Sequence, residues 1–318
     1  MPRNRRDRRN PNGMVVHVTA RVYKGLPFAA RQSMHMVVEG LMARAQMLYP
    51  VTICAFIFMG NHHHFIFAGD GNRISAFMGY LQGEIAKAYK RFVPEMFASQ
   101  GFWEGRFHEQ RLADANAVID KLIYLYSNPI SAKLVHTIDD YPGLTSYAAL
   151  KQGAPLSRLC PFVPIRACQS QPFTYSRSKD LNSARKLLSR AVEFLELKID
   201  PFAWLKCFKT EISQVSARQL VLEGVRTVEN AHRNIPMMGA QALVTRPLNR
   251  PFSPESKSRT PFLQASCPEL RRSAIESYRN FCKLCREAWF RFQRRMPATW
   301  PRGAFFPSTR VLPPVGVA

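Results

Sequence analysis

The chain has 318 residues, 46% of them hydrophobic and 11% aromatic, so it can bury a core rather than remain disordered. Its net charge of +23 attracts polyanions, with nucleic acid as the first candidate and an anionic membrane surface as the second. The apolar run at 51–59 is far shorter than the roughly 20 residues of a membrane-spanning helix, so no membrane span is expected.

The charge is uneven along the chain. Residues 1–150 hold 17 Lys and Arg against 11 Asp and Glu, whereas residues 151–318 hold 28 against 11, so the second half is the more basic. The Arg-rich N-terminus is not followed by an apolar segment long enough for a secretion signal. Seven cysteines, an odd number, suit a reducing compartment better than a disulfide framework. We therefore expect a cytoplasmic protein.

The N-terminal half opens with a basic arm, residues 1–12, which is either solvated or in contact with phosphate groups. β-Branched residues over 14–22 predict a strand. Apolar residues at spacings of three and four then predict an amphipathic helix from 28 to 48. Two apolar runs, 51–59 and 62–68, flank a Gly-Asn turn signal and predict a hairpin.

Three further elements complete this half. Residues 70–72 offer a cap for a long helix, and a loop and strand are expected near 102–111. A helix over 114–128 should stop at Pro129, because proline cannot supply the next helical donor. The order strand, helix, hairpin, helix, strand, helix predicts an α+β domain over residues 13–150, with a mainly antiparallel sheet and helices packed on it.

The second half begins with prolines, Ser, Arg and Gln over 151–178, which predict a linker and a domain boundary. Beyond it, a basic and mainly helical region is expected over 179–318, with helices near 181–197, 217–233 and 268–296. The last helix mixes Arg and Lys with aromatic side chains. A helix that contacts nucleic acid has this composition, and so does a solvated amphipathic helix on a basic protein, so both interpretations stay open.

Two short motifs bear chemistry. On a strand, side chains alternate between faces, so His62 and His64 share a face and can bind one metal ion, while His63 lies opposite. On a helix, Tyr124 and Asn128 lie one turn apart on one face. A phenol and an amide oxygen can then both point to the same place beside the helix. Together the motifs suggest a phosphoryl-transfer site.

Other chemistry-bearing side chains are expected to be structural. The isolated His17 and His35 are predicted to be packing or surface residues. Cys282 and Cys285 form a single C-x-x-C without a second pair or a nearby His, so they are predicted to be buried thiols rather than zinc ligands.

The two motifs resemble a known family. The stretch 61–67, Asn-His-His-His-Phe-Ile-Phe, is similar to the HUH motif (His, hydrophobic, His) of single-strand DNA transposases. Tyr124-x-x-x-Asn128-Pro129 resembles an element of the REP-associated tyrosine transposases, relatives of the insertion-sequence transposases that use one tyrosine. The opening strand and residues 103–111 also resemble that family. The resemblance covers about residues 13–150, and the second half resembles extensions of longer members.

The resemblance implies a ferredoxin-like HUH nuclease fold and a reaction. Tyr124 would cleave single-stranded DNA, in a hairpin-bearing substrate, through a 5′-phosphotyrosine. A divalent ion, Mg or Mn, would be held by His62, His64 and the Asn128 side-chain oxygen. The family also implies a homodimer.

Two positions depart from the family pattern or compete with it. The middle HUH position is normally apolar but is His63 here, which is expected to be partly exposed or an extra DNA or metal contact. Tyr126 competes with Tyr124 as the nucleophile but faces away from Asn128 on a helix.

Alternative interpretations stay open for the expected phosphate contacts and for the activity of the protein. Arg106 and Lys121 are either phosphate contacts or plain surface charges. The alternative to a transposase is a domesticated protein that binds single strands or hairpins without cleaving them. An accidental match of the motifs is the third reading.

Overall fold

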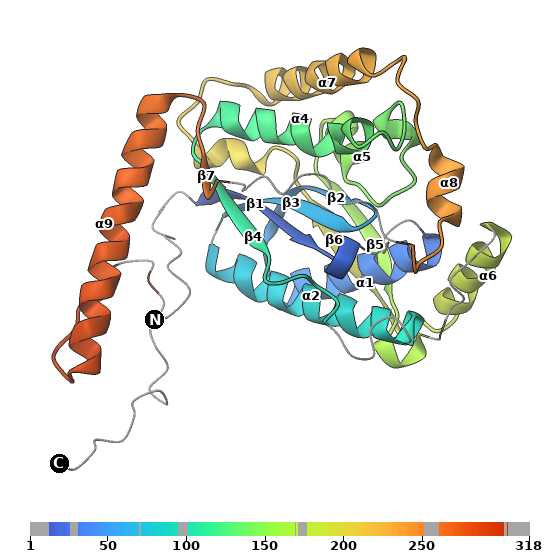
Figure 1. Ribbon diagram of the computed structural model, residues 1–318, viewed down its shortest axis with the longest axis horizontal. Helices are drawn as coiled ribbons and strands as arrows, with labels where there is room; N and C mark the ends of the chain where they lie inside the picture. The colour runs from blue at the N-terminus through green and yellow to red at the C-terminus, as the bar shows by residue number, and fades with distance from the viewer. Residues whose placement is uncertain are drawn as a thin grey trace, which may run out of the picture.

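The computed structural model describes residues 13–25, 31–69, 71–94, 101–168, 170, 177–250, 261–301 and 304. The predicted arm, residues 1–12, lies outside this part of the chain. One sheet lies between two groups of helices (Figure 1). No helix in the described ranges is both long and apolar enough to cross a membrane.

The described elements alternate along the chain. The strands are β1 (Met14–Arg21), β2 (Thr52–Phe58), β3 (His62–Gly69), β4 (His108–Leu112), β5 (Leu156–Phe162), β6 (Glu193–Ile199) and β7 (Leu263–Gln264). The α-helices are α1 (Gln32–Leu48), α2 (Gly71–Phe92), α4 (Ala115–Ser131), α5 (Tyr147–Gln152), α6 (Arg177–Leu188), α7 (Gln214–Ala231), α8 (Ala240–Thr245) and α9 (Pro268–Gln293). Short 3-10 turns are η1 (Tyr23–Gly25), η2 (Ile138–Asp140), η3 (Ile165–Ala167) and η4 (Ala203–Cys207).

The seven strands form one sheet in the order β5-β6-β2-β3-β1-β4-β7. Four neighbouring pairs are antiparallel, and only β2–β6 and β4–β7 are parallel. The predicted α+β class with a mainly antiparallel sheet is therefore confirmed. The predicted hairpin is β2–β3, and it occupies the middle of the sheet.

Both faces of β3 are covered, because its side chains alternate between two cores. Phe65 and Phe67 point to the layer that contains α1 and α2, whereas Ile66 and Ala68 point to the layer that contains α4. Helices α4 and α7 lie on one side of the sheet in Figure 1, and α1 and α2 lie on the other. The α4 side is thus the face on which His62 and His64 stand.

The predicted linker over 151–178 contains a strand instead. Residues 156–162 form β5, which pairs with β6 along its whole length. Prolines suggested a linker, but β5 is the edge strand of the sheet, where a residue without a backbone N–H is tolerated. Pro161 lies within this edge strand, opposite Phe194.

The predicted helix over 181–197 is also only partly right. Helix α6 ends at Leu188, and residues 193–199 form β6. Exposed and buried residues alternate along β6, with Leu195, Leu197 and Ile199 inward, which is the two-residue period of a strand. The sheet therefore runs through both halves of the sequence, and the second half is not simply helical.

Helix α4 continues past Pro129, where the sequence predicted its end. Proline removes one helical donor, but it stands in the last turn of a helix that ends at Ser131. The carbonyls there still find donors, because Ala132 N–H bonds the Asn128 oxygen at 2.9 Å and Leu134 N–H bonds the Pro129 oxygen at 2.9 Å. The Asn128 backbone is thereby fixed inside a regular helix.

Candidate functional site

The paired histidines stand on one face of β3. The ring centroids of His62 and His64 are 4.8 Å apart, with the rings nearly perpendicular. His62 is half-buried and His64 is buried. The two side chains lie on the same face of the strand, as the alternation of side chains along a strand predicts.

His63 points to the opposite face, as expected, but the prediction that it is partly exposed or contacts DNA or metal is wrong. Its side chain is fully buried and packs against the rings of Phe58, Phe65 and Trp103. Neither ring nitrogen has a hydrogen-bond partner within the described chain. His63 is a core residue because that face of β3 is covered by helices.

Helix α4 brings Tyr124 and Asn128 to the same histidines. Asn128 Nδ2 lies 3.1 Å from His64 Nε2. The Tyr124 ring stands at right angles to the His64 ring, with the centroids 5.7 Å apart, and the Tyr124 side chain is 51% exposed. The four residues singled out from the sequence therefore meet at one place, between β3 and α4.

Tyr126, the competing tyrosine, is in the core. Its side chain is fully buried, and its hydroxyl hydrogen-bonds Ser146 Oγ at 2.9 Å. Burial raises the pKa of Tyr126 above the usual value of a phenol. Of these two tyrosines, only Tyr124 presents its side chain to solvent beside the histidines.

The two expected phosphate contacts lie in different settings. Lys121, one turn before Tyr124 on α4, holds its Nζ 4.8 Å from the centre of the Tyr124 ring. Burial lowers the pKa of Lys121. Arg106 is exposed in the loop that leads into β4. Contact of either residue with phosphate stays a prediction.

His17, expected to be a packing or surface residue, touches the site. Its Nε2 lies 2.8 Å from His64 Nδ1, and the two rings are stacked with their centroids 5.1 Å apart. The pairing of β1 with β3 sets Thr19 opposite His64, so His17 shares the His64 face two residues away. No sequence pattern predicts this contact, because it depends on the register between two strands.

The protonation states of the pair suit metal binding. Burial lowers the pKa of His62 to about 3 and holds the pKa of His64 well below its usual value, so both rings are neutral at pH 7. His62 Nδ1 lies 2.6 Å from Asn61 Oδ1. An amide oxygen only accepts, so Nδ1 of His62 carries the proton and Nε2 keeps its lone pair.

The donor set fits a divalent ion only if the amide takes part. No group of three or more His, Cys, Asp or Glu side chains in the described residues is arranged to hold a metal. Two neutral imidazoles and an amide oxygen form a borderline set that admits Mg or Mn. Asn128 now directs its amide nitrogen to His64, and a half-turn of the amide would present the oxygen.

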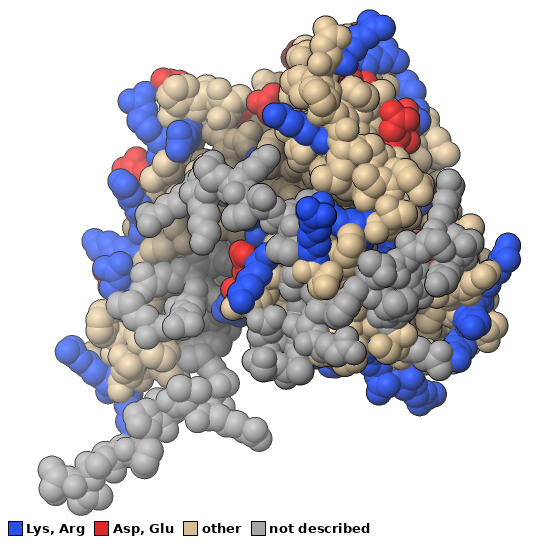
Figure 2. All heavy atoms as spheres, turned by 45° about the vertical axis from the view of Figure 1, so that its right-hand side comes forward, with Lys and Arg blue, Asp and Glu red and all other residues tan. Residues whose placement is uncertain are grey.

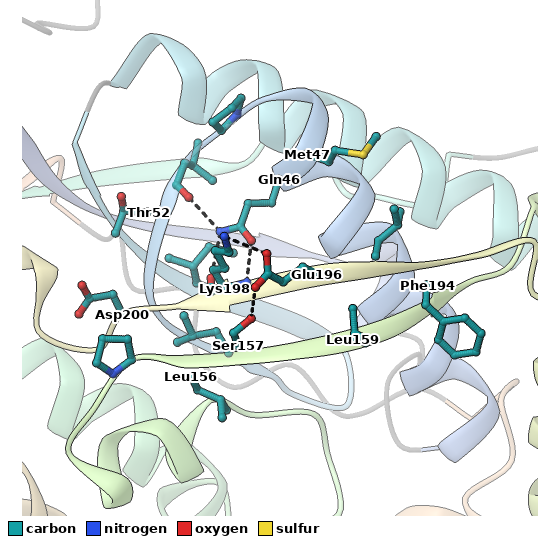
Figure 3. A pocket seen from close by; sticks show the side chains of 16 residues that line it. Gln46, Met47, Thr52, Leu156, Ser157, Leu159, Phe194, Glu196, Lys198 and Asp200 are labelled. Atoms are coloured by element: carbon teal, nitrogen blue, oxygen red, sulfur yellow. Dashed lines mark hydrogen bonds and ion pairs between the residues drawn. The ribbon is translucent and has the colours of Figure 1, made fainter.

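An open cavity of about 800 Å³ lies elsewhere, between the end of α1 and the β5–β6 pair (Figure 3). Its wall is mainly apolar and includes Leu159 and Phe194. Three of its polar side chains interact with one another, since Ser157 donates to Glu196 at 2.5 Å and Lys198 lies 2.8 Å from the same carboxylate. None of the motif residues lines this cavity.

The surface charge matches the sequence. On the face seen in Figure 2, Lys and Arg side chains stand around the molecule and acidic side chains are fewer. The chain is thus a basic α+β protein in which a half-exposed tyrosine stands beside two neutral histidines and an amide.

Comparison with known proteins gives a distant structural likeness. No family model matches the chain, and no curated protein matches it. Among the solved structures that match, one is described as a REP-associated tyrosine transposase bound to a REP hairpin. It is 16% identical, and the match covers 52% of this chain and 90% of that chain with a TM-score of 0.37. A likeness of this size assigns neither a family nor an activity to this chain.

Proposed function

We propose that this protein is a metal-dependent single-strand DNA nickase and strand transferase of the HUH type that uses Tyr124 as its nucleophile. The observation that carries the proposal is the meeting of Tyr124, Asn128 and His64 across α4 and β3, with His62 beside them. The resemblance of both motifs to single-strand DNA transposases supports the same reaction. The net charge of +23 suits a polyanionic substrate.

The proposed metal ligands are Nε2 of His62, Nε2 of His64 and the side-chain oxygen of Asn128. A bound Mg or Mn ion would polarise the scissile phosphate and stabilise the negative charge that builds on its oxygens. The three proposed ligands and Tyr124 stand near one another within one chain, which supports action of the tyrosine in its own subunit. The homodimer that the family resemblance implies is a separate proposal.

The tyrosine would act as a covalent nucleophile. The Tyr124 oxygen forms a bond to phosphorus, the bond from phosphorus to the 3′ oxygen breaks, and the leaving 3′ oxygen ends as a hydroxyl. A phenol ionises near pH ~10, so its environment must favour the phenolate. The Lys121 ammonium, 4.8 Å from the ring, favours the negative charge. Attack by a 3′ hydroxyl on the phosphotyrosine rejoins DNA, so no nucleotide cofactor is needed.

The test is the formation of a covalent protein–DNA adduct. A pool of hairpin-bearing single-stranded oligonucleotides with randomised flanks is incubated with the protein and Mn, and adducts are separated in SDS. A 5′-phosphotyrosine keeps the 3′-labelled part of the strand on the protein and releases the 5′-labelled part. Tyr124→Phe should abolish the adduct.

Tyr126→Phe is the matched control, because it removes a phenol two residues away that is buried in the core. This variant should keep the adduct. An unchanged adduct in Tyr124→Phe would overturn the assignment. Tight and salt-sensitive binding of hairpins without an adduct under any metal would instead favour a non-cleaving nucleic-acid-binding protein.

A further inference from the structure

We infer that His17 is a positioning residue, which holds the His64 imidazole through a hydrogen bond so that His64 Nε2 faces the reaction site. This inference rests on the proposed function, because it assigns a task to His64. His17 lies on β1 and not on the strand or the helix that carry the motifs. Neither motif contains His17, and neither motif predicts its contact with His64.

The contact between the two histidines is direct and buried. His17 Nε2 and His64 Nδ1 are 2.8 Å apart, and the nearly parallel rings make an interplanar angle of 12°. His17 is 2% exposed and His64 is 4% exposed, so water does not compete for this bond. Each ring therefore restricts the rotation of the other.

The direction of the hydrogen bonds follows from the partners at the ends. The Asn128 amide nitrogen is a donor, so His64 Nε2 accepts from it at 3.1 Å. A neutral imidazole carries one N–H, so His64 Nδ1 carries it and donates to His17 Nε2. His17 must then carry its own proton on Nδ1. The bond thus leaves the lone pair of His64 on Nε2, the nitrogen beside Asn128 and Tyr124.

Gln110 stands beside His17 on the neighbouring strand, β4, and carries a possible acceptor for the proton on His17 Nδ1. The β1–β4 pairing sets Gln110 directly opposite His17, and its side chain is 2% exposed. Within the described residues, neither the buried His17 Nδ1 nor the buried Gln110 Oε1 has a hydrogen-bond partner. A donor and an acceptor therefore stand in paired residues, which fits the proton placement deduced for His17.

The two proposed histidine ligands are both held through Nδ1, His62 by a residue of the turn before β3 and His64 by a residue of β1. Asn61 Oδ1 holds Nδ1 of His62, and His17 Nε2 holds Nδ1 of His64. In both rings Nε2 is the nitrogen that keeps the lone pair an ion would bind. Partners of this kind fix the tautomer and the orientation of a ligating histidine, and their loss typically weakens metal binding by roughly 10- to 100-fold.

The test compares His17→Leu with His17→Gln in the full chain. Leucine removes the acceptor, whereas the glutamine side-chain oxygen can replace His17 Nε2 as the acceptor. Long-range ¹H–¹⁵N correlation spectra of the metal-free protein report which nitrogen of His64 carries the proton. Titration with Mn, followed by electron paramagnetic resonance of the free ion, gives the metal affinity without DNA.

His64 should be protonated on Nδ1 in the wild type and in His17→Gln. In His17→Leu a proton on Nδ1 has no acceptor, so it should move to Nε2 while the Asn128 amide turns its oxygen toward that nitrogen. The Mn affinity should fall by roughly 10- to 100-fold in His17→Leu and recover in His17→Gln. His63→Leu, which changes a buried histidine on the other face of the sheet, should alter neither readout. An unchanged His64 tautomer in His17→Leu would overturn the inference. The tautomer is measured without metal. It therefore tests the role of His17 even if the wild type binds no Mn and the proposed function fails.

Discussion

At the residue scale, four neutral histidines in and around β3 make folding sensitive to acid. Burial lowers the pKa of His17, His62 and His63 to about 3 and that of His64 well below its usual value. In the unfolded chain each histidine titrates near ~6.5. Between these values the unfolded state binds more protons, so this stabilisation is complete above pH ~6.5 and is lost as the pH falls.

His63 gives the cleanest prediction, because its two nitrogens lack partners and its ring touches only aromatic neighbours among the contacts described. A buried polar group without a hydrogen bond costs about 1–3 kcal/mol. His63→Leu should therefore raise the free energy of unfolding in urea at pH 7. The gain should grow by up to about 1.4 kcal/mol per pH unit below pH ~6.5.

The control for this prediction is His136→Leu, since His136 is exposed. It should leave the pH dependence as in the wild type. The measurement is made with a chelator present, so that metal binding does not contribute. A slope against pH that is the same in His63→Leu and in the wild type would contradict the burial account.

Tyr126→Phe should cost little stability and no reactivity. It removes one buried hydroxyl that bonds Ser146 Oγ. A hydrogen bond of this kind contributes about 1 kcal/mol net, so the urea midpoint should fall slightly with an unchanged slope. A loss of several kcal/mol would show that this phenol supports more of the core than its one bond indicates.

The site residues differ in how far the sequence could predict them. His62, His64, Tyr124 and Asn128 could be grouped because alternation on a strand and spacing on a helix are periodic within one element. His17 could not, because its contact depends on which residues of β1 and β3 pair. Exposure of His63 was predicted wrongly, because no local pattern reports that helices cover both faces of the sheet.

At the element scale, α1 begins on a carboxylate from a distant part of the chain. The backbone N–H groups of Gln32 and Ser33 donate to Asp180 at 2.7 and 3.2 Å, and the Ser33 hydroxyl donates to it at 2.7 Å. Asp180 is 3% exposed and belongs to α6. The first turn of α1 is therefore stabilised by the second half of the sequence.

Asp180→Ala should lower the free energy of unfolding by about 2–3 kcal/mol, because it leaves buried donors at the start of α1 without a partner. Asp139→Ala is the comparison, since Asp139 pairs with Lys151 on the surface. Surface pairs contribute about 0–1 kcal/mol, so this variant should change little. Equal losses in the two variants would argue against the cap.

The elements of the first half were predictable because their apolar spacing is regular. The sequence predicts a helix where β6 lies, because a helical pattern immediately precedes this strand, although Leu195, Leu197 and Ile199 alternate. The sequence predicts a linker where β5 lies, because the edge position that tolerates Pro161 is a property of the whole sheet and not of the local sequence.

At the scale of the whole molecule, the shared sheet changes how a DNA contact in the second half can be tested. Removing residues after 150 would take away β5, β6 and β7 and uncover β2 and β4. A loss of DNA binding after such a truncation would then report a damaged fold. Substitutions on an exposed element are a better choice.

Helix α9 offers such an element, because it stands apart from the two helical layers in Figure 1. Arg272, Arg279, Lys283 and Arg286 are exposed and fall within an arc of roughly 60° on the helix. Its buried residues Phe281, Cys285 and Ala288 lie on the opposite side. The cations thus form one stripe, interrupted by the exposed Glu276, that can follow a phosphate backbone.

We predict that Arg279→Gln with Lys283→Gln weakens the binding of single-stranded hairpin DNA. Two lost phosphate contacts should reduce the slope of log affinity against log salt by roughly 1.4. The control carries Arg185→Gln and Lys186→Gln on α6, which remove the same charge from exposed positions elsewhere. If both pairs have the same effect on affinity and slope, α9 has no specific part in DNA binding.

In the proposed reaction, Tyr124 forms a covalent bond to DNA beside His62, His64 and Asn128. Mass spectrometry of the nuclease-trimmed and protease-digested wild-type adduct tests it most directly, because it identifies the residue that carries the nucleotide. We expect a 5′-phosphonucleotide on the peptide that contains Tyr124, with fragment ions that place it on that phenol. A nucleotide on any other side chain, or an unmodified Tyr124 in an adduct-bearing sample, would contradict it.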